Sequence, residues 1–437
     1  MIHIQIDPQI EKKVKKIHET VPVNDSARTP KYLIPELAVR ISEQLQKPNP
    51  RDADRIVNNF LRKFFVDENG AVESELISDY LFRRDIDCIV MAFWECVLTV
   101  WISSHPPGHA AQIMADPQKY ARQLSMWNGA KERALEDLKA RNSGNGPAAA
   151  QKCISVEMLP FFDNITEEDL TASKVSDSVF GKQRKLNKAV FKFQQDIANN
   201  EKKKKAAKDK GALDILSGIF DYDLLSGSPR HEMMTAMEIP VCPYCNRQYI
   251  TSYPDAADNK TTADLDHYYC KSYYPYLALS LYNFVPSCQI CNSRFKIARD
   301  FYGTPHLYPY DPVPNARVTF ELGDAELLLN ESAWDSPDVP FLSIETTGKA
   351  AENSVDTFHL EQVYQSHKDY VHELVWKSKL YNEHMIASLQ SNFTELFSSD
   401  KDVRDLLFGQ YLDENKAHKR PLAKLTQDIL KDIYDLD

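Results

Sequence analysis

The chain has 437 residues, of which 43% are hydrophobic and 26% are charged, proportions typical of a globular protein with two or three domains. The N-terminal stretch MIHIQIDPQIEKKVKK contains no apolar segment followed by a cleavage site, which argues against a secretory signal peptide. The formal net charge of −11 argues at first against a polyanionic substrate, although charges further apart than about 10 Å are largely screened, so local charge matters more.

Residues 1–140 are expected to form a helical N-terminal domain. Apolar residues recur every three or four positions in LIPELAVRISEQL (Leu33–Leu45) and in DADRIVNNFLRKFF (Asp52–Phe65), as they do on one face of an amphipathic helix. The apolar run from Cys88 to Ile102 is interrupted by a glutamate and is shorter than the roughly 20 residues of a membrane span. We interpret it as a buried helix or one that a partner covers, and we expect a cytoplasmic protein without a membrane segment.

A linker and a basic region follow. Gly, Pro, Asn and Ser gather in residues 141–150, which is typical of a linker. Residues 151–237 are predicted to be a basic helical region, in which the stretch 182–210 contains eleven Lys or Arg residues against three acids. Such a stretch is either a solvated charged face or a contact with the phosphate backbone of a nucleic acid, and the sequence leaves both open.

Residues 238–311 contain two Cys-x-x-Cys pairs in a region rich in aromatic and turn residues. Cys242 pairs with Cys245 and Cys288 with Cys291, with 42 residues between the pairs. In a chain without a secretion signal this spacing indicates zinc ligation rather than disulfides. Tetrahedral zinc takes four thiolates at about 2.3 Å and then has no open position. We therefore expect a structural zinc ion.

The residues between the two pairs suit the hydrolysis of a phosphodiester bond. Asp266 and His267 are adjacent, Asn283 follows sixteen residues after His267, and Asn292 directly follows Cys291. Such a reaction needs a base that activates water and a divalent cation that stabilises charge on the phosphate. Asp266 and Asn292 offer the oxygen ligands that a hard cation prefers. Zinc at Cys291 would brace the helix that carries Asn292.

Other residues of the region are open to two interpretations. Lys271, Arg294 and Lys296 are candidates to bind the phosphate of a substrate, although residues of this kind are more often surface charges. The many tyrosines can stack on splayed bases or form the core of a small zinc module.

The rest of the chain is predicted to contain short strands and then helices. Within residues 312–354, RVTFEL and FLSIETT have the composition of strands. Residues 355–437 are predicted to be helical, with residues 361–390 as the longest stretch. Together the elements predict an α+β fold, in which a small ββα-metal module with a four-cysteine zinc knuckle is embedded in a mostly helical body.

The segments CPYCNRQYI, DLDHYYCKSYYPYLALSLYNFVPSCQICNSRFK and HLYPYDP resemble the HNH, or ββα-metal, endonuclease superfamily in its cysteine-bearing form. The resemblance implies a strand, a loop, a second strand and a helix around one magnesium or manganese ion. It implies that His267 is the general base, that Asp266 and Asn292 bind the catalytic ion, and that Asn283 holds the loop and orients His267. The third residue of the HNH signature is Asn292 here, where other members have a His. An Asn at this position favours a harder cation.

More narrowly, residues 266–280 and 283–292 are similar to the HNH subunits of bacterial antiphage systems that are encoded beside an ATPase, as in Septu-type defence. We therefore expect an endonuclease that cuts DNA, or else RNA, as the effector of a defence complex with an ATPase partner. Two other hypotheses stay open. One is a stand-alone, modification-dependent restriction endonuclease, and the other is a non-catalytic zinc-ribbon protein that binds nucleic acid or a partner.

Overall fold

The computed structural model describes residues 4, 6–24, 29–47, 51–90, 92, 93, 96, 100, 211–253, 260–302, 304–311, 317–322 and 342–434. In these residues helices combine with three two-stranded antiparallel sheets, so the predicted α+β class is confirmed. The predicted linker (141–150) and the basic stretch (182–210) lie outside the described residues.

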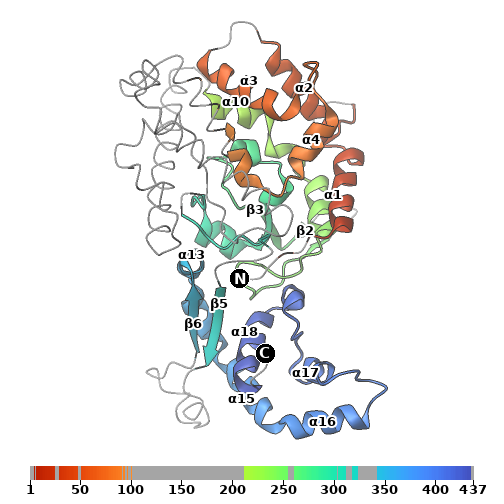
Figure 1. Cartoon of the computed structure of the whole chain (residues 1–437), viewed down its shortest axis with the longest axis vertical. Coiled ribbons are helices and arrows are strands. Elements are labelled where there is room, and N and C mark those ends of the chain that lie inside the picture. The colour runs from red at the N-terminus through yellow and green to blue at the C-terminus, as the bar shows by residue number, and fades with distance from the viewer. Residues whose placement is uncertain are drawn as a thin grey trace, which may run out of the picture.

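Helices form the N-terminal part of the structure. They are α1 (Pro8–Thr20), α2 (Leu33–Leu45), α3 (Asp52–Phe65) and α4 (Ser74–Leu81). The ends of α2 and α3 coincide with the predicted ones, because each buries the apolar face that defined it, including Leu37 and Ile41 of α2 and Phe60 of α3. Helix α10 (Ala212–Ile219) returns from far along the chain and packs beside α3 (Figure 1).

The apolar run that begins at Cys88 contributes to the core. Ile89, Val90 and Phe93 are at most 2% exposed, and the ring of Phe93 lies 4.6 Å from that of Tyr276. From Ile89 onward its described residues are therefore internal. Of the helices that the structure describes, none has the length and apolar character needed to cross a membrane.

The central module contains short elements. They are η2 (Tyr222–Leu225), α11 (Ser228–Ala236), β1 (Ser252–Tyr253), β2 (Lys260–Thr261), β3 (Ala263–His267), η3 (Pro275–Leu277), η4 (Leu281–Asn283), β4 (Phe284–Cys288) and η5 (Ile290–Lys296). Strand β3 pairs antiparallel with β4, so that His267 lies opposite Phe284. Strand β4 leads directly into η5, a single stretch of π-helix, a rare conformation that is frequent at functional sites.

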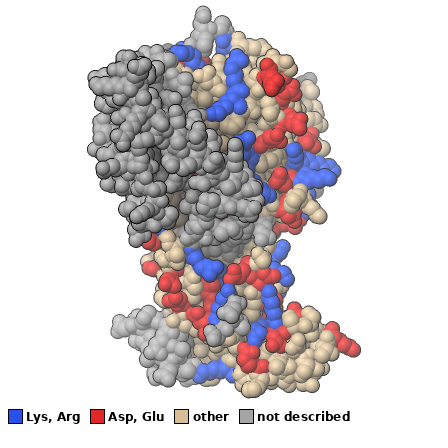
Figure 2. All heavy atoms as spheres, viewed as in Figure 1, with Lys and Arg blue, Asp and Glu red and all other residues tan. Residues whose placement is uncertain are grey.

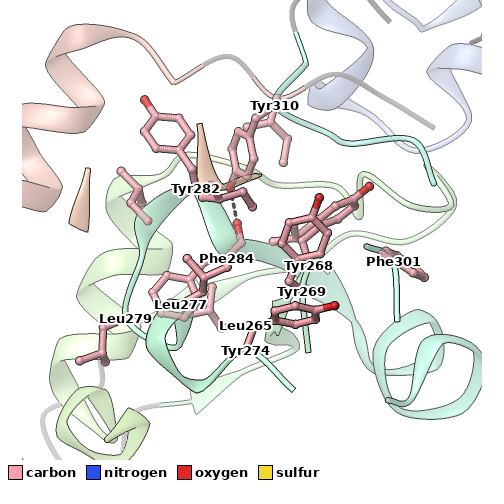
Figure 3. Close-up of a cluster of buried hydrophobic side chains, with 14 of the residues drawn as sticks. Leu265, Tyr268, Tyr269, Tyr274, Leu277, Leu279, Tyr282, Phe284, Phe301 and Tyr310 are labelled. Atoms are coloured by element: carbon pink, nitrogen blue, oxygen red, sulfur yellow. Dashed lines mark hydrogen bonds between the residues drawn. The ribbon is translucent and has the colours of Figure 1, made fainter. Parts of the chain in front are cut away.

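Aromatic side chains form the core around this hairpin (Figure 3). Tyr268, Tyr269 and Tyr274 are buried, and the hydroxyl of Tyr310 donates a hydrogen bond to the carbonyl of Phe284. Aromatic rings bury a large area for their number, which suits a small module with few aliphatic residues. These tyrosines are core residues and are not available for stacking on bases.

The C-terminal part begins with a third sheet. Its elements are β5 (Arg317–Leu322), β6 (Leu342–Thr347), α13 (Lys349–Phe358), α14 (Leu360–Tyr364), η7 (Gln365–His367), α15 (Lys368–Leu380), α16 (Glu383–Asn392), α17 (Asp400–Phe408), η8 (Glu414–Lys419) and α18 (Ala423–Tyr434). Both strands lie where the sequence predicted them. Helix α13, in contrast, begins inside the segment that was predicted to hold only strands.

The longest predicted helical stretch, residues 361–390, is divided. The chain leaves the helix at Tyr381, and the side chain of Asn382 then accepts a hydrogen bond from the N–H of Met385 and caps α16. The helices α15–α18 lie at the opposite end of the molecule from α2 and α3, with the module between them (Figure 1). Basic and acidic side chains are interspersed over the described atoms of the face in Figure 2, with no large area of one sign.

Candidate functional site

The four cysteines of the two Cys-x-x-Cys pairs come together. The Sγ atoms of Cys242, Cys245, Cys288 and Cys291 all lie within 4.8 Å of one another, and all four residues are buried. Zinc bound at about 2.3 Å holds sulfur ligands about 3.8 Å apart, so one ion fits this cluster. The part of the chain that the structure describes holds no second such group of His, Cys, Asp or Glu ligands.

The surroundings of the sulfur atoms favour thiolates around a cation. The backbone N–H of Arg247 donates to Sγ of Cys245 over 3.4 Å, and that of Cys291 donates to Sγ of Cys288 over 3.5 Å. Burial raises the pKa of the Cys242 thiol, so several thiolates in one buried cluster require a compensating cation such as Zn²⁺. The prediction of a four-cysteine group able to hold a metal is therefore confirmed, and its closed set of ligands suits a structural ion.

The first Cys-x-x-Cys turn connects the cluster to its neighbours. Tyr244 lies between the two cysteines, and its hydroxyl donates to Oδ2 of Asp266 over 2.6 Å while its ring stacks on Phe358. Asn246, which has a positive φ of 50°, accepts a hydrogen bond from the N–H of Lys424 over 2.9 Å. The turn is therefore joined to strand β3 on one side and to helix α18 on the other.

His267 ends strand β3 and is 7% exposed. Its Nε2 lies 3.0 Å from the carbonyl oxygen of Ala278. Because a carbonyl only accepts, we assign the proton to Nε2, and Nδ1 is then an acceptor; no hydrogen bond joins Nδ1 to the described residues. The rings of Tyr222 and Phe284 pack edge-on against the imidazole. Burial lowers the pKa of His267 to about 3, so the ring is neutral at pH 7.

Asn283 holds the loop that follows His267. Its side chain is fully buried. Oδ1 accepts from the N–H of Tyr269 over 2.7 Å, and Nδ2 donates to the carbonyls of Tyr269 and Leu277, each over 3.1 Å. The amide thus connects both ends of the loop, and the next residue, Ala278, supplies the carbonyl that holds His267.

Asp266 lies in a buried ion pair. Its Oδ1 accepts from Nζ of Lys296 over 3.0 Å, and the same Nζ donates to the carbonyl of His267 over 2.6 Å. Asp266 is 4% exposed and Lys296 is 1% exposed. Burial raises the pKa of Asp266, and the charge of Lys296 counteracts this shift. Since Tyr244 donates to Oδ2, both carboxylate oxygens have partners.

Asn292 has a different partner from the one predicted. It lies on η5, and its Nδ2 donates to Oδ2 of Asp264 over 3.0 Å. Asp264 and Asp266 share one face of β3, because side chains alternate along a strand. The hydrogen-bond partner of Asn292 is thus Asp264, whereas Asp266 is paired with Lys296. In this arrangement the residues do not fit the divalent cation that the resemblance implies at these two positions.

The three basic candidates have different surroundings. Lys271 is exposed, and its Nζ lies 4.4 Å from the centre of the Tyr222 ring that packs against His267. Arg294 is exposed on η5. The structure corrects the expectation for Lys296, because an ammonium that is buried and paired with a carboxylate does not contact a substrate phosphate.

Sequence reasoning did not identify three residues that shape the site. Tyr244 stands inside the first Cys-x-x-Cys pair, and Asp264 precedes Asp266 by the two positions that return to one strand face. Both signals were available in the sequence. No local pattern pointed to Tyr222, which reaches His267 from η2, outside the predicted module of residues 238–311.

Comparison of the chain with protein-family models, with curated proteins and with solved structures finds no match in any of the three. The four-cysteine cluster and the geometry around His267 are therefore the observations from which a function is inferred.

Proposed function

We propose that the protein is an HNH-type endonuclease that hydrolyses phosphodiester bonds, with DNA as the first candidate substrate and RNA as the second. The observation that carries the proposal is the orientation of His267, whose Nε2 the carbonyl of Ala278 holds and whose Nδ1 is thereby kept as a proton acceptor. The chain order of strand, loop, strand and helix beside the cysteine cluster supports it.

In the proposed reaction Nδ1 of His267 takes a proton from water while the water oxygen forms the new bond to phosphorus. The bond from phosphorus to the leaving oxygen of the nucleic acid breaks in the same displacement, and the leaving oxygen takes a proton from solvent water. Asn283 acts as a positioning residue, because it fixes the loop that carries Ala278. The exposed ammonium of Lys271, which lies over the Tyr222 ring that packs against His267, is the proposed group that attracts the phosphate.

The test is a cleavage assay with the purified, zinc-loaded full chain on plasmid DNA, single-stranded DNA and total RNA, each with magnesium, manganese or EDTA. We expect wild type to cut at least one of these and His267→Ala to lose the activity. His384→Ala, which changes an exposed histidine on α16, is the matched control and should cut like wild type. Cleavage by His267→Ala at the wild-type rate would exclude His267 as the base.

A second candidate function is a zinc-ribbon module that binds nucleic acid or a partner without cutting. The buried Lys296–Asp266 pair favours it, because that pair occupies the carboxylate that a catalytic ion would use. This function predicts equal nucleic-acid binding by wild type and His267→Ala, with no cleavage under any metal condition.

The proposed biological role is that of an effector in an antiphage defence complex with an ATPase partner. Its support is the resemblance to such subunits, together with the net charge of −11, which weakens unaided binding to a polyanion. Co-expression with the ATPase of a neighbouring gene should give a stable complex that cuts faster than the chain alone. Efficient cutting of modified DNA by the chain alone would favour the stand-alone restriction enzyme.

A further inference from the structure

The ammonium of Lys296 lies where a bound cation would be expected, beside the residue that precedes the proposed base. It is 3.0 Å from Oδ1 of Asp266 and 2.6 Å from the carbonyl oxygen of His267. The ring centre of Phe301 lies 4.9 Å away on a further side. Two oxygen atoms and an aromatic face thus surround a charge that is only 1% exposed.

Because both charges are buried, their pairing shows which group neutralises the Asp266 carboxylate. An isolated ammonium or carboxylate in a protein interior is strongly unfavourable, so each charge of the pair depends on the other. The remaining carboxylate oxygen accepts from Tyr244, which the cysteine cluster holds in place. Each carboxylate oxygen of Asp266 therefore already has a buried partner, and Asn292 is turned to Asp264.

We infer that Lys296 is a built-in counter-ion for Asp266, and that the folded chain binds no divalent cation through this carboxylate. The inference rests on the proposed function only in treating His267 and its neighbours as the reactive centre. Its consequence is that the positive charge beside His267 belongs to the chain and does not depend on the concentration of metal in solution.

Removal of the ammonium should convert the same place into a divalent-cation site. Lys296→Met keeps an unbranched side chain of similar length and leaves Asp266 and the carbonyl of His267 as oxygen ligands next to a small space. Such ligands are those that Mn²⁺ and Mg²⁺ prefer. Lys296→Arg keeps the positive charge and serves as the matched control.

The experiment is titration of zinc-loaded protein with Mn²⁺, with free Mn²⁺ measured by electron paramagnetic resonance. We expect Lys296→Met to bind one Mn²⁺ at least tenfold more tightly than wild type or Lys296→Arg. The double variant Asp266→Asn/Lys296→Met should lose the gained site. Failure of Lys296→Met to gain a site would overturn the inference, as would a wild-type site that Asp266→Asn removes.

Zinc content and thermal unfolding show whether each variant is folded. If Lys296→Met does not fold, wild type is compared with the double variant, in which neither buried charge remains. Equal Mn²⁺ binding by these two supports the inference, and an extra site in wild type contradicts it. The result is independent of nuclease activity, because Mn²⁺ binding is measured without substrate, whereas the proposed function is tested by the loss of cleavage in His267→Ala.

Discussion

At the scale of single residues, the Asp266 carboxylate joins the cysteine cluster to the proposed base. Its two oxygens accept from Tyr244 and Lys296, and all three side chains are buried. Such a network is stable only when every member has its partner, since an unpaired buried polar group is costly. Each member can therefore be tested by a substitution that removes one bond and keeps the volume.

Tyr244→Phe removes the hydroxyl that donates to Asp266 and keeps the ring that stacks on Phe358. We expect the free energy of unfolding to fall by about 1–3 kcal/mol, because the buried carboxylate loses a donor. Urea unfolding at pH 7 measures the loss, and zinc content should stay at one ion per chain. An unchanged free energy of unfolding would show that the hydrogen bond contributes nothing.

Buried His18 predicts a dependence of stability on pH. Burial lowers its pKa to about 4, below the value of about 6.5 in an unfolded chain. Between these values the unfolded state binds a proton that the folded state does not, so stability falls as the pH decreases. For this residue the loss from pH 7 to pH 5 should be about 2 kcal/mol. Urea unfolding at several pH values gives the change of the free energy of unfolding with pH for wild type and for His18→Gln. An equal pH dependence in the two proteins would contradict the account.

At the scale of elements, the spacing of apolar residues along the chain predicted those helices and strands that depend on local sequence alone. Helices α2 and α3 and strands β5 and β6 lie at the predicted residues, because each buries the side of a regular pattern. The break between α15 and α16 was missed, since the capping residue Asn382 overrides a pattern that continues through it.

The candidate site was predictable only in part. The spacing of the two Cys-x-x-Cys pairs was sufficient to predict the cysteine cluster. The Lys296–Asp266 pair was not predictable, because its members are 30 residues apart and meet only through the way η5 packs against β3. The same packing decides that Asn292 contacts Asp264 instead of Asp266.

Helix α16 is expected to be the least protected helix of the C-terminal part. Ile386 is its only buried residue, and Phe393 and Leu396 beyond its end are 50% and 73% exposed. Helix α18, in contrast, is buried over most of its length. Hydrogen exchange followed by mass spectrometry should show α16 amides exchanging at least tenfold faster than those of α18. Equal protection would indicate that another surface covers α16 in solution.

At the scale of the whole molecule, the cysteine cluster connects three parts of the chain. The turn that holds Cys242 and Cys245 contacts β3 through Tyr244 and α18 through Asn246, and the hydroxyl of Tyr364 donates to the carbonyl of Cys245. Loss of the metal or of a cysteine at the cluster should therefore alter the packing of both the proposed site and the C-terminal helices.

Loss of zinc is expected to destabilise the molecule as a whole. Cys288→Ser should lose the ion and lower the free energy of unfolding by more than about 3 kcal/mol, because metal binding and folding are coupled. Cys88→Ser, at a half-buried cysteine outside the cluster, is the control and should keep the metal. Metal analysis measures the zinc content of each variant, and thermal unfolding measures its stability. A Cys288→Ser variant that keeps zinc and has wild-type stability would contradict a structural role for the ion.

The central claim is that His267 activates water for phosphodiester hydrolysis, and its most direct test is the ratio of cleavage rates for wild type and His267→Ala. The substrate should be one that wild type cuts, and both proteins should be equally loaded with zinc. Loss of a general base predicts a decrease of about 10²–10⁴-fold, with His384→Ala unchanged. Equal rates for wild type and His267→Ala would contradict the claim and place the chemistry elsewhere.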